Sequence, residues 1–405
     1  MSNPADAEYR KNEVPSEWRE RILGDVTTLL TGFPFKSSQY TDEASGTKLL
    51  RGDNIVQGQL RWDGVKRWPA NGEAIDSMYR LREGDVVLAM DRPWIEAGLK
   101  YAAISDLDLP CLLVQRVACM RPTEGLSSSF LQYLIGSGGF TKHILSVETG
   151  TAVPHISGAQ IKEYSFLCPP IDEQEAIAKL LRSLDDKIDL LHRQNKTLEA
   201  MAEALFRQWF VEGEAEILEE RPLSGIAYFV NGLACQKYPP TNELEKLPVL
   251  KIRELSNGIT EASDWATSQV KPEYLVEAGD VIFAWSASLM VKVWDGEKCV
   301  LNQHLFKVTS KEFPTWFYLM WCKHHLAEFI AISSSHATTM GHIKRGDLDA
   351  AMVLVPPPPV LETMSVQMTP LLEKQIENAR QRKTLETLRD SLLPKLMSGE
   401  IRVAN

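Results

Sequence analysis

The chain has 405 residues, 44% of them hydrophobic and 24% charged, an ordinary composition for a protein with two or three globular domains. Its formal net charge of −10 disfavours a nucleic-acid partner at face value, but residues 171–221 hold 13 acidic and only 7 basic side chains, so the flanking segments are nearly balanced and charge does not exclude DNA binding. The sequence predicts a soluble cytoplasmic protein with reduced thiols. It has no apolar run near the ~20 residues of a membrane helix, and its polar N-terminus is unlike a secretory signal. Its six cysteines are scattered and form no C-x-x-C pair.

Residues 1–170 are predicted to form a first globular domain of mixed α/β or α+β type. The runs "DVVLAM" (85–90) and "CLLVQRVACM" (111–120) are rich in β-forming residues and are bounded by Gly, Asp and Pro. The run "SSFLQYLIGS" (128–137) has the apolar spacing of a helix. Strand order within the domain does not follow from these runs.

Residues 171–213 are predicted to form a long helix with a heptad seam. Apolar residues alternate at spacings of four and three from Ile177 to Trp209, as in a coiled coil. Asp172 and Glu175 directly after Pro170 resemble a capping box that starts the helix. The seam positions assigned to helix pairing are Leu184, Ile188, Leu191, Asn195, Leu198 and Leu205, of which the polar Asn195 is expected to fix the register.

Residues 214–357 are predicted to form a second globular domain, and residues 358–405 a second long helix with a C-terminal tail. "GDVIFAW" and "HLFKV" are the strand-like runs of this domain, and "PTWFYLMWCKHHLAEFIA" is helix-like. The second helix has seam positions at Leu371, Leu385 and Leu392 around a polar middle. Pro370 and Pro394 are expected to kink this helix or to trim its ends.

The second half of the chain repeats the first. The matching phrases are "RQNKTLE" (193–199) with "RQRKTLE" (380–386), "GDVVLAM" (84–90) with "GDVIFAW" (279–285), and "LVQRVACM" (113–120) with "LNQHLFKV" (301–308). Gly32 aligns with Gly232, and His155 aligns with His342. The order is therefore domain, helix, domain, helix. This connectivity predicts an antiparallel pair of helices and an approximate two-fold axis between two similar α+β domains.

Motifs of catalysis are missing from the sequence. It contains no G-x-x-x-x-G-K-[ST], G-x-G-x-x-G, H-E-x-x-H or G-x-S-x-G pattern. "GDVV" and "GDVI" are interpreted as turns that lead into buried strands. Four histidines raise the alternative of a metal site, but no cysteine or carboxylate stands at ligand spacing, so no metal is expected; they are His324, His325, His336 and His342. No catalytic residue is assigned.

Polar and basic loops occur at matching places in the two predicted domains. Hydroxyl and basic groups of this kind can bind phosphates and the edges of bases, although any single residue could equally belong to an ordinary polar surface. The candidate DNA-binding residues are Lys36, Ser37, Arg51, Arg92, Lys142, Thr151, His155, Lys237, Lys251, His304, Thr338, His342, Lys344 and Arg345.

The order of these phrases resembles that of the specificity subunits of type I restriction–modification systems. The resemblance covers almost the whole chain and rests on "TGFPFKSSQY" with "LLRGDNI", on "GDVIFAW" with "LNQHLFKV", on "HATTMGHIKRGDL" before "LVPPPP", and on the two long helices. It implies two target-recognition domains, each reading one half of a split DNA sequence, separated by an antiparallel coiled coil. The first domain departs from the pattern because "LVQRVACM" lacks the histidine of "LNQHLFKV", so a role of His304 does not transfer to it.

The resemblance also implies partners and cofactors. The long helices would dock methyltransferase subunits, in two copies, that transfer a methyl group from S-adenosylmethionine to adenine, and a restriction subunit with translocase and nuclease activity would join them. This chain would bind no cofactor, with S-adenosylmethionine, ATP and Mg on its partners. Three alternatives stay open: a specificity subunit of a modification-only or phage-defence complex, a tandem scaffold protein without a DNA role, and a nuclease, which is disfavoured because no acidic cluster has convincing metal spacing.

Overall fold

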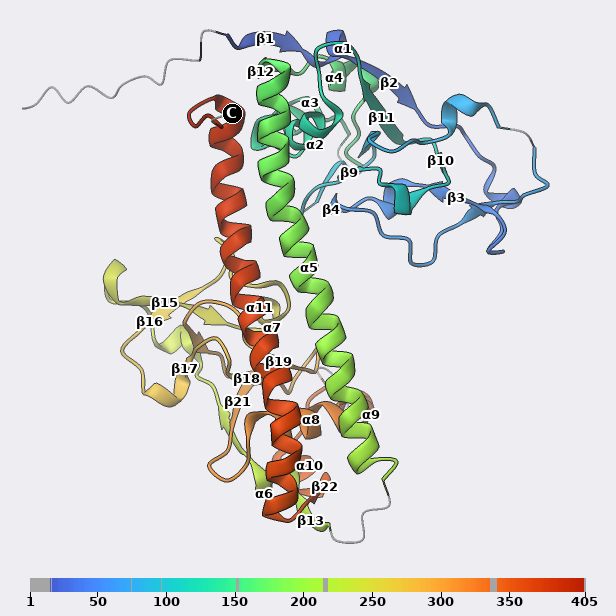
Figure 1. Cartoon of the computed structure of the whole chain (residues 1–405). Coiled ribbons are helices and arrows are strands. Elements are labelled where there is room, and N and C mark those ends of the chain that lie inside the picture. Colours follow the sequence, from blue (N-terminus) through green and yellow to red (C-terminus); the bar gives the residue numbers. More distant parts are fainter. Residues whose placement is uncertain are drawn as a thin grey trace, which may run out of the picture. The chain divides into compact units, whose positions relative to one another are not determined.

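The computed structural model describes Pro15 and residues 17–73, 75–95, 97–150, 153–213, 218–335 and 341–403 (Figure 1). The chain divides into two compact units, which we call unit 1 (residues 1–185 and 387–405) and unit 2 (residues 186–386). Each unit therefore includes part of both long helices. The domain boundaries expected from the sequence, which set the helices apart from the globules, stay predictions.

Unit 1 is built on small sheets covered by helices. Five strands form one sheet in the order β2 (Thr27–Thr31), β11 (Val117–Pro122), β6 (Val86–Ala89), β9 (Tyr101–Ala103) and β4 (Gln57–Gly58). A second sheet has the order β10 (Cys111–Leu113), β3 (Thr47–Leu50) and β5 (Arg67–Trp68), with β10 parallel to β3. Two further antiparallel pairs are β1 (Arg19–Ile22) with β12 (Ser165–Cys168), and β7 (Trp94–Ile95) with β8 (Gly98–Leu99). The helices are α1 (Leu23–Val26), α2 (Ser128–Ile135), α3 (Gly138–Val147) and α4 (Gly158–Lys162), with 3-10 turns at Ser37–Gln39 (η1), Gly52–Asn54 (η2), Ser77–Tyr79 (η3) and Asp106–Asp108 (η4).

The core of unit 1 includes the ends of both long helices. All four residues of β6 are buried, which explains why "VVLA" is a continuous apolar run rather than an alternating one. Phe130 and Phe140 of the covering helices are fully buried, and so are Ile177 of the first long helix and Leu396 of the second. The long helices are therefore part of this core and not only a connection.

Unit 2 has the same kind of architecture. One sheet has the order β14 (Tyr228–Asn231), β21 (Leu305–Thr309), β18 (Val281–Ala284) and β19 (Met290–Val293), and the other has the order β16 (Trp265–Thr267), β15 (Lys246–Leu250), β20 (Cys299–Leu301) and β17 (Leu275–Val276). Strand β13 (Glu219–Pro222) pairs with β22 (Met352–Val355). The helices are α6 (Leu223–Ile226), α7 (Ile252–Asn257), α8 (Thr315–His324), α9 (Leu326–Ser335) and α10 (Arg345–Ala350), with 3-10 turns at Cys235–Lys237 (η5), Glu243–Glu245 (η6) and Pro272–Tyr274 (η7). Its core is aromatic and includes the buried Phe283, Trp316, Phe317 and Phe329.

The two units share one topology, which confirms the predicted internal repeat and the α+β class. In unit 1, β11 pairs antiparallel with both β2 and β6 and β10 is parallel to β3; in unit 2, β21 pairs antiparallel with both β14 and β18 and β20 is parallel to β15. Gly32 donates its backbone N–H to Val117, and Gly232 donates to Leu305 at the equivalent place. The repeat is thus one of hydrogen-bonding pattern as well as of sequence.

Gly32 and Gly232 mark a close backbone approach where only glycine fits. A Cβ on Gly32 would lie 2.1 Å from the carbonyl oxygen of Val114, and a Cβ on Gly232 would lie 2.3 Å from that of Asn302. Because the obstructing atoms belong to the backbone, Gly32→Ala and Gly232→Ala are each expected to lower the free energy of unfolding by about 2 kcal/mol or more. Urea unfolding of the two variants measures this.

Two other glycines supply the controls for that experiment. Nothing lies within 4 Å of a Cβ built on Gly138 in α3 or on Gly346 in α10, and alanine is the better helix former. Gly138→Ala and Gly346→Ala are therefore expected to leave stability unchanged or slightly higher. Equal losses in all four variants would contradict the account of the close approach.

The long helices α5 (Ile171–Phe210) and α11 (Pro358–Ser398), green and red in Figure 1, run antiparallel within each unit. In unit 2, the amide of Asn195 donates to the carbonyl of Gln375 (3.0 Å), while Asn378 donates to Asn195 Oδ1 (3.0 Å). In unit 1, Asp185, which precedes Asn195 on α5, forms an ion pair with Arg389, which follows Asn378 on α11 (3.0 Å). Positions on α5 therefore pair with progressively earlier positions on α11 as α5 advances.

Pro370 and Pro394 are expected from the sequence to kink the second helix or to trim its ends. Trimming does not occur, because α11 runs without interruption through both; a kink stays a prediction. Each proline removes one backbone hydrogen bond. The neighbouring Met368 and Leu396 are buried in the cores of unit 2 and unit 1. Packing on these cores outweighs the local cost of the prolines.

The seam residues differ in how deeply they are placed. Leu191 is 1% exposed, and the half-buried Asn195 bonds to α11. Leu205 and Leu371 pack against the core of unit 2, and Leu392 against that of unit 1. The remaining seam positions are partly buried: Leu184, Ile188, Leu198 and Leu385. No helix among the described residues is long and apolar enough to cross a membrane.

A buried carboxylate ties the C-terminal segment to the start of α5 in unit 1. Glu173 is 6% exposed and accepts hydrogen bonds from Arg402 (2.8 Å from both Nε and Nη2) and from Trp18 Nε1 (3.0 Å). The hydrogen bonds from Arg402, and then that from Trp18, hold the pKa of Glu173 below its ordinary value of 4.5.

This carboxylate makes stability depend on pH. A depressed folded-state pKa contributes stability that is present above the ordinary value and is lost as the pH falls through the folded pKa. The native chain is therefore expected to lose stability below pH 4.5, whereas Glu173→Gln is expected to have a lower melting temperature at pH 7 and to converge with the native chain as the pH falls. Melting temperatures between pH 7 and pH 3 measure this, and a gap that stays constant would contradict it.

Candidate nucleic-acid interface

Three loop segments of unit 1 bring together a group that we call the Asp91 cluster, comprising Asp91, Arg116 and His155. His155 Nδ1 lies 2.6 Å from Asp91 Oδ1, Arg116 Nε lies 3.8 Å from Asp91 Oδ2, and Arg116 Nη1 lies 3.5 Å from His155 Nε2. The Arg116 side chain is 61% exposed and that of Asp91 is 40% exposed. The cluster therefore presents a guanidinium, a carboxylate and an imidazole to solvent.

Backbone hydrogen bonds hold the Asp91 cluster together. Met90, at the end of β6, donates to the carbonyl of Arg116 (2.8 Å) and accepts from Ile156 (3.0 Å), while Arg92 donates to Pro154 (2.7 Å). Arg92 and Arg116 have φ angles of 45° and 70°, a backbone region that residues other than glycine adopt at a cost in conformational energy. The loops are thus fixed in one conformation by their surroundings.

The matching loops of unit 2 form what we call the Ser286 cluster, comprising Trp285, Ser286, His304 and His342. Ser286 Oγ lies 3.1 Å from His304 Nδ1. The ring of Trp285 lies 6.1 Å from that of His304 and 6.2 Å from that of His342, centroid to centroid. This cluster comprises two imidazoles, an indole and the hydroxyl of Ser286, a residue that is only 5% exposed.

The two clusters stand on the same backbone frame. Trp285 donates to His304 and accepts from Ile343, as Met90 does with Arg116 and Ile156. Asp91 forms a bridge with His155, and Ser286 forms one with His342. Ala287, with φ of 57°, stands where Arg92 has φ of 45°. One frame therefore carries different hydrogen-bonding groups in the two units, and such groups at base edges discriminate between base pairs.

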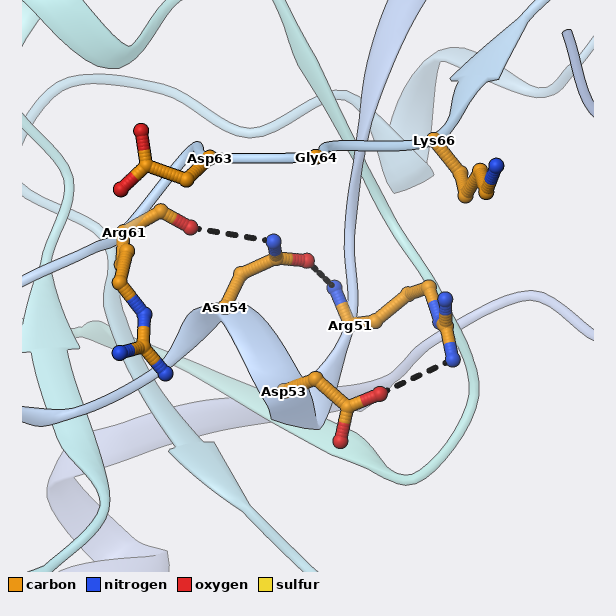
Figure 2. Close-up of a pocket in the computed structure, with 7 residues that line it drawn as sticks. All are labelled: Arg51, Asp53, Asn54, Arg61, Asp63, Gly64 and Lys66. Atoms are coloured by element: carbon orange, nitrogen blue, oxygen red, sulfur yellow. Dashed lines mark hydrogen bonds and ion pairs between the residues drawn. The ribbon is translucent and has the colours of Figure 1, made fainter. Parts of the chain in front are cut away.

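A basic pocket of about 400 Å³ lies beside η2 in unit 1 (Figure 2). Figure 2 shows Asn54 between Arg51 and Arg61: Asn54 Oδ1 accepts from the Arg51 backbone (3.0 Å), and Asn54 Nδ2 donates to the Arg61 carbonyl (3.1 Å). Arg51 also pairs with Asp53 at 3.0 Å. The lining comprises three cations and two carboxylates, from Arg51, Asp53, Asn54, Arg61, Asp63, Gly64 and Lys66. Lys66 pairs with Asp42 at 2.9 Å. Guanidinium and ammonium groups such as those of the lining can bind a phosphate.

The equivalent site in unit 2 is occupied by internal ion pairs. Lys251 stands where Arg51 does, and its backbone N–H donates to Glu254 Oε2 (3.3 Å). The buried Glu254 pairs with Arg253 at 2.7 Å, and the Lys251 ammonium pairs with Asp264. Lys251 and Arg253 therefore have carboxylate partners, as Arg51 and Lys66 do in unit 1.

The structure brings only some of the predicted site residues together. Arg92 and His155 meet at the Asp91 cluster, His304 and His342 at the Ser286 cluster. The others are exposed at separate places: Lys36 and Ser37 at η1, Lys142 on α3, Lys237 in η5, and Lys344 and Arg345 at the start of α10. Thr151 and Thr338 lie outside the described residues. Sequence reasoning missed Asp91, Arg116, Trp285 and Ser286.

The "GDV" turns are structural, as predicted. Asp85 accepts from the Arg82 backbone (2.9 Å) and pairs with Arg121 (2.7 Å); Asp280 accepts from Glu277 (2.8 Å) and pairs with Lys307 (2.7 Å). Each aspartate closes the turn before a buried strand and neutralises a cation on the neighbouring strand. Both carboxylates are therefore already paired with groups of the fold itself.

Metal-binding and thiol chemistry find little support in the part of the chain that the structure describes. No group of three His, Cys, Asp or Glu there could hold a metal ion. His325 is bonded to the Met352 carbonyl (2.9 Å) and lies near Glu328. All six cysteines are free and buried, and burial raises the pKa of the Cys111 thiol to about 12, which makes it a poor nucleophile.

The fold and the loop clusters define a duplicated recognition protein. Its two units share one topology, each carries polar loops on a common frame, and both include parts of two long antiparallel helices. A family model for the type I restriction modification DNA specificity domain matches residues 15–200 and again residues 216–387. The chain therefore belongs to the family of type I restriction–modification DNA specificity domains. Its two matches coincide with the internal repeat, and its role is recognition rather than catalysis.

Similar proteins carry the same description. The chain is 27% identical over 332 residues to the type I restriction enzyme MjaIX specificity subunit of Methanocaldococcus jannaschii, which covers 76% of each chain. It is 38% identical over 184 residues to the EcoAI specificity subunit of Escherichia coli, which covers 45% of this chain and 30% of that one. The crystal structure of a type I restriction–modification S subunit from M. genitalium superposes with a TM-score of 0.58 at 13% identity, over 96% of this chain and 98% of that chain. The structural likeness supports the fold.

Proposed function

We propose that this chain is the DNA-specificity subunit of a type I restriction–modification complex, and that each unit reads one half of a bipartite target. The observation that carries the proposal is the pair of loop clusters: one backbone frame presents Asp91, Arg116 and His155 in unit 1, but Ser286, His304 and His342 in unit 2. A duplicated frame with different readout groups is what recognition of two different half-sites requires.

The predicted domains and candidate contacts belong to this proposal. Residues 1–170 and 214–357 would be the target-recognition domains, and residues 171–213 and 358–405 the helical segments that set the spacer. The Asp91 and Ser286 clusters would contact base edges, and the basic pocket of Figure 2 would hold a phosphate of the first half-site. The remaining candidate residues would contact the flanking backbone of the DNA.

The catalytic partners are inferred with the function. Two methyltransferase subunits would dock on the helices, where "RQNKTLE" and "RQRKTLE" provide two similar exposed faces, and would bind S-adenosylmethionine. A restriction subunit would bind ATP and Mg. This chain supplies no residue to those reactions. Six free, buried thiols suit a cytoplasmic location.

DNA retention by the complex with the methyltransferase tests the function against the scaffold alternative. Contacts with phosphates release counterions, so binding to a cognate duplex is expected to fall steeply between about 50 and 200 mM salt. Competition with a scrambled duplex separates specific from non-specific binding. Salt-independent retention, or equal competition by both duplexes, would support a protein without a role in DNA recognition.

A further inference from the structure

Unit 1 has a two-stranded ribbon that unit 2 lacks at the matching position. In unit 1, the chain between β6 and β9 runs from Ala89 to Tyr101 and forms β7 and β8. In unit 2, the chain between β18 and β19 passes directly from Ala284 to Met290. The extra segment begins directly after Asp91, in the same frame that carries the Asp91 cluster.

The ribbon exposes apolar side chains on both of its faces. Trp94 pairs with Leu99 and Ile95 pairs with Gly98. Leu99 is buried in the core of unit 1, but Trp94 beside it is 40% exposed; Ile95, also 40% exposed, faces a glycine that has no side chain to cover it. Successive residues of a strand point to opposite faces. Both faces of the ribbon are therefore partly uncovered.

The ribbon is held in place by hydrogen bonds both next to its turn, at Gly98, and at its base, at Lys100. Gln57 Nε2 donates to the Gly98 carbonyl (3.3 Å), and Lys100 donates its backbone N–H to Pro93 (2.7 Å). The Lys100 ammonium also lies 3.9 Å from where a Cβ on Gly52 would be, next to the η2 turn that borders the basic pocket. An anchored ribbon presents Trp94 and Ile95 without the entropic cost of ordering a loop.

We propose that this ribbon enters the major groove of the first half-site, where Trp94 and Ile95 contact bases and Arg92 and Lys100 contact the flanking phosphates. The major groove admits a two-stranded ribbon, and apolar side chains there can contact the C5-methyl group of thymine. DNA is favoured over a protein partner because the ribbon follows Asp91 of the Asp91 cluster in the chain and ends at Lys100, whose ammonium lies beside Gly52 of the η2 turn. This inference rests on the proposed function and assigns the ribbon to one half-site only.

The test measures Kd for the complex of this chain with its methyltransferase on two duplexes. Duplex A carries both half-sites, and duplex B carries the second half-site with the first one scrambled. For the variant Trp94→Ala/Ile95→Ala, affinity for duplex A is expected to fall by about tenfold or more, the usual cost of losing readout at one base pair, with affinity for duplex B unchanged. The preference for A over B therefore shrinks.

Trp265→Ala in unit 2 is the matched control, because Trp265 is 41% exposed but has the Lys246 ammonium 4.5 Å from its ring centroid. It is expected to keep the wild-type preference. An unchanged preference in the double variant, or loss of the methyltransferase from it, overturns the inference while the proposed function stands. A wild-type complex without any preference for A overturns the proposed function itself.

Discussion

Replacing Arg116 by asparagine is expected to change recognition of the first half-site and to leave the second unchanged. Arg116 is the exposed donor of the Asp91 cluster, and a guanidinium bonded to a base is worth about 1–3 kcal/mol of discrimination. Methylation at cognate sites should therefore fall about 10- to 100-fold, with relaxed choice at one base pair of that half-site. Asparagine is chosen because it tolerates the positive φ of 70°. Sequencing of methylated bases in cells that carry the variant measures this.

The control is the same substitution at the matching position of unit 2. His304→Asn, in the Ser286 cluster, is expected to alter the second half-site and to leave the first intact. Changes in both half-sites from either variant would show that the clusters act through general stability. No change from either variant would remove both clusters from base recognition.

A matched heptad insertion in both long helices is expected to lengthen the spacer by about three base pairs with both half-sites unchanged. Seven helical residues add about 10 Å, against about 3.4 Å for each base pair. The division of the chain into two units indicates where to insert so that neither unit is cut: after Asp185 in α5 and after Glu386 in α11. The insertions then fall at the same level of the antiparallel pair and keep its seam. The methylated motif of the variant gives the spacer.

Insertion in α5 alone is the informative control. It shifts Asp186 and all later residues of α5 against α11 while Asp185 keeps its ion pair with Arg389, so the seam is broken on one side. That variant is expected to lose stability and methylation rather than to adopt a longer spacer. A matched insertion that altered the bases at constant spacing would contradict the role of the helices as a ruler.

Much of the fold could be predicted because it is repeated. The "GDV" turns lie before buried strands in both units, Gly32 and Gly232 stand at the same close approach, and Asn195 bonds across the helical pair. Prediction from the local sequence pattern failed where tertiary packing determines how far a helix continues. Pro370 and Pro394 do not end α11, because the buried residues beside them hold the helix on two cores.

The candidate site was harder to predict, because each cluster forms from segments far apart in the chain. His155 and His342 were found through the alignment of the repeats. Asp91 and Ser286 follow directly after the same aligned strands, but a residue beside a strand has no spacing that marks it as functional. Arg116 stands where His304 does, and the sequence showed this only as a missing histidine. The common backbone frame places Arg116 and His304 at equivalent positions, and our proposal assigns both to contacts with bases.

The most direct test of the account is the methylated motif that this chain specifies together with its methyltransferase. Expression of the pair in a host without other adenine methylation, followed by sequencing of the modified bases, gives that motif. Two unlike half-sites separated by a spacer of unspecified bases are predicted. A single contiguous motif, or methylation that does not depend on this chain, would contradict the claim that its two units read two halves of one target.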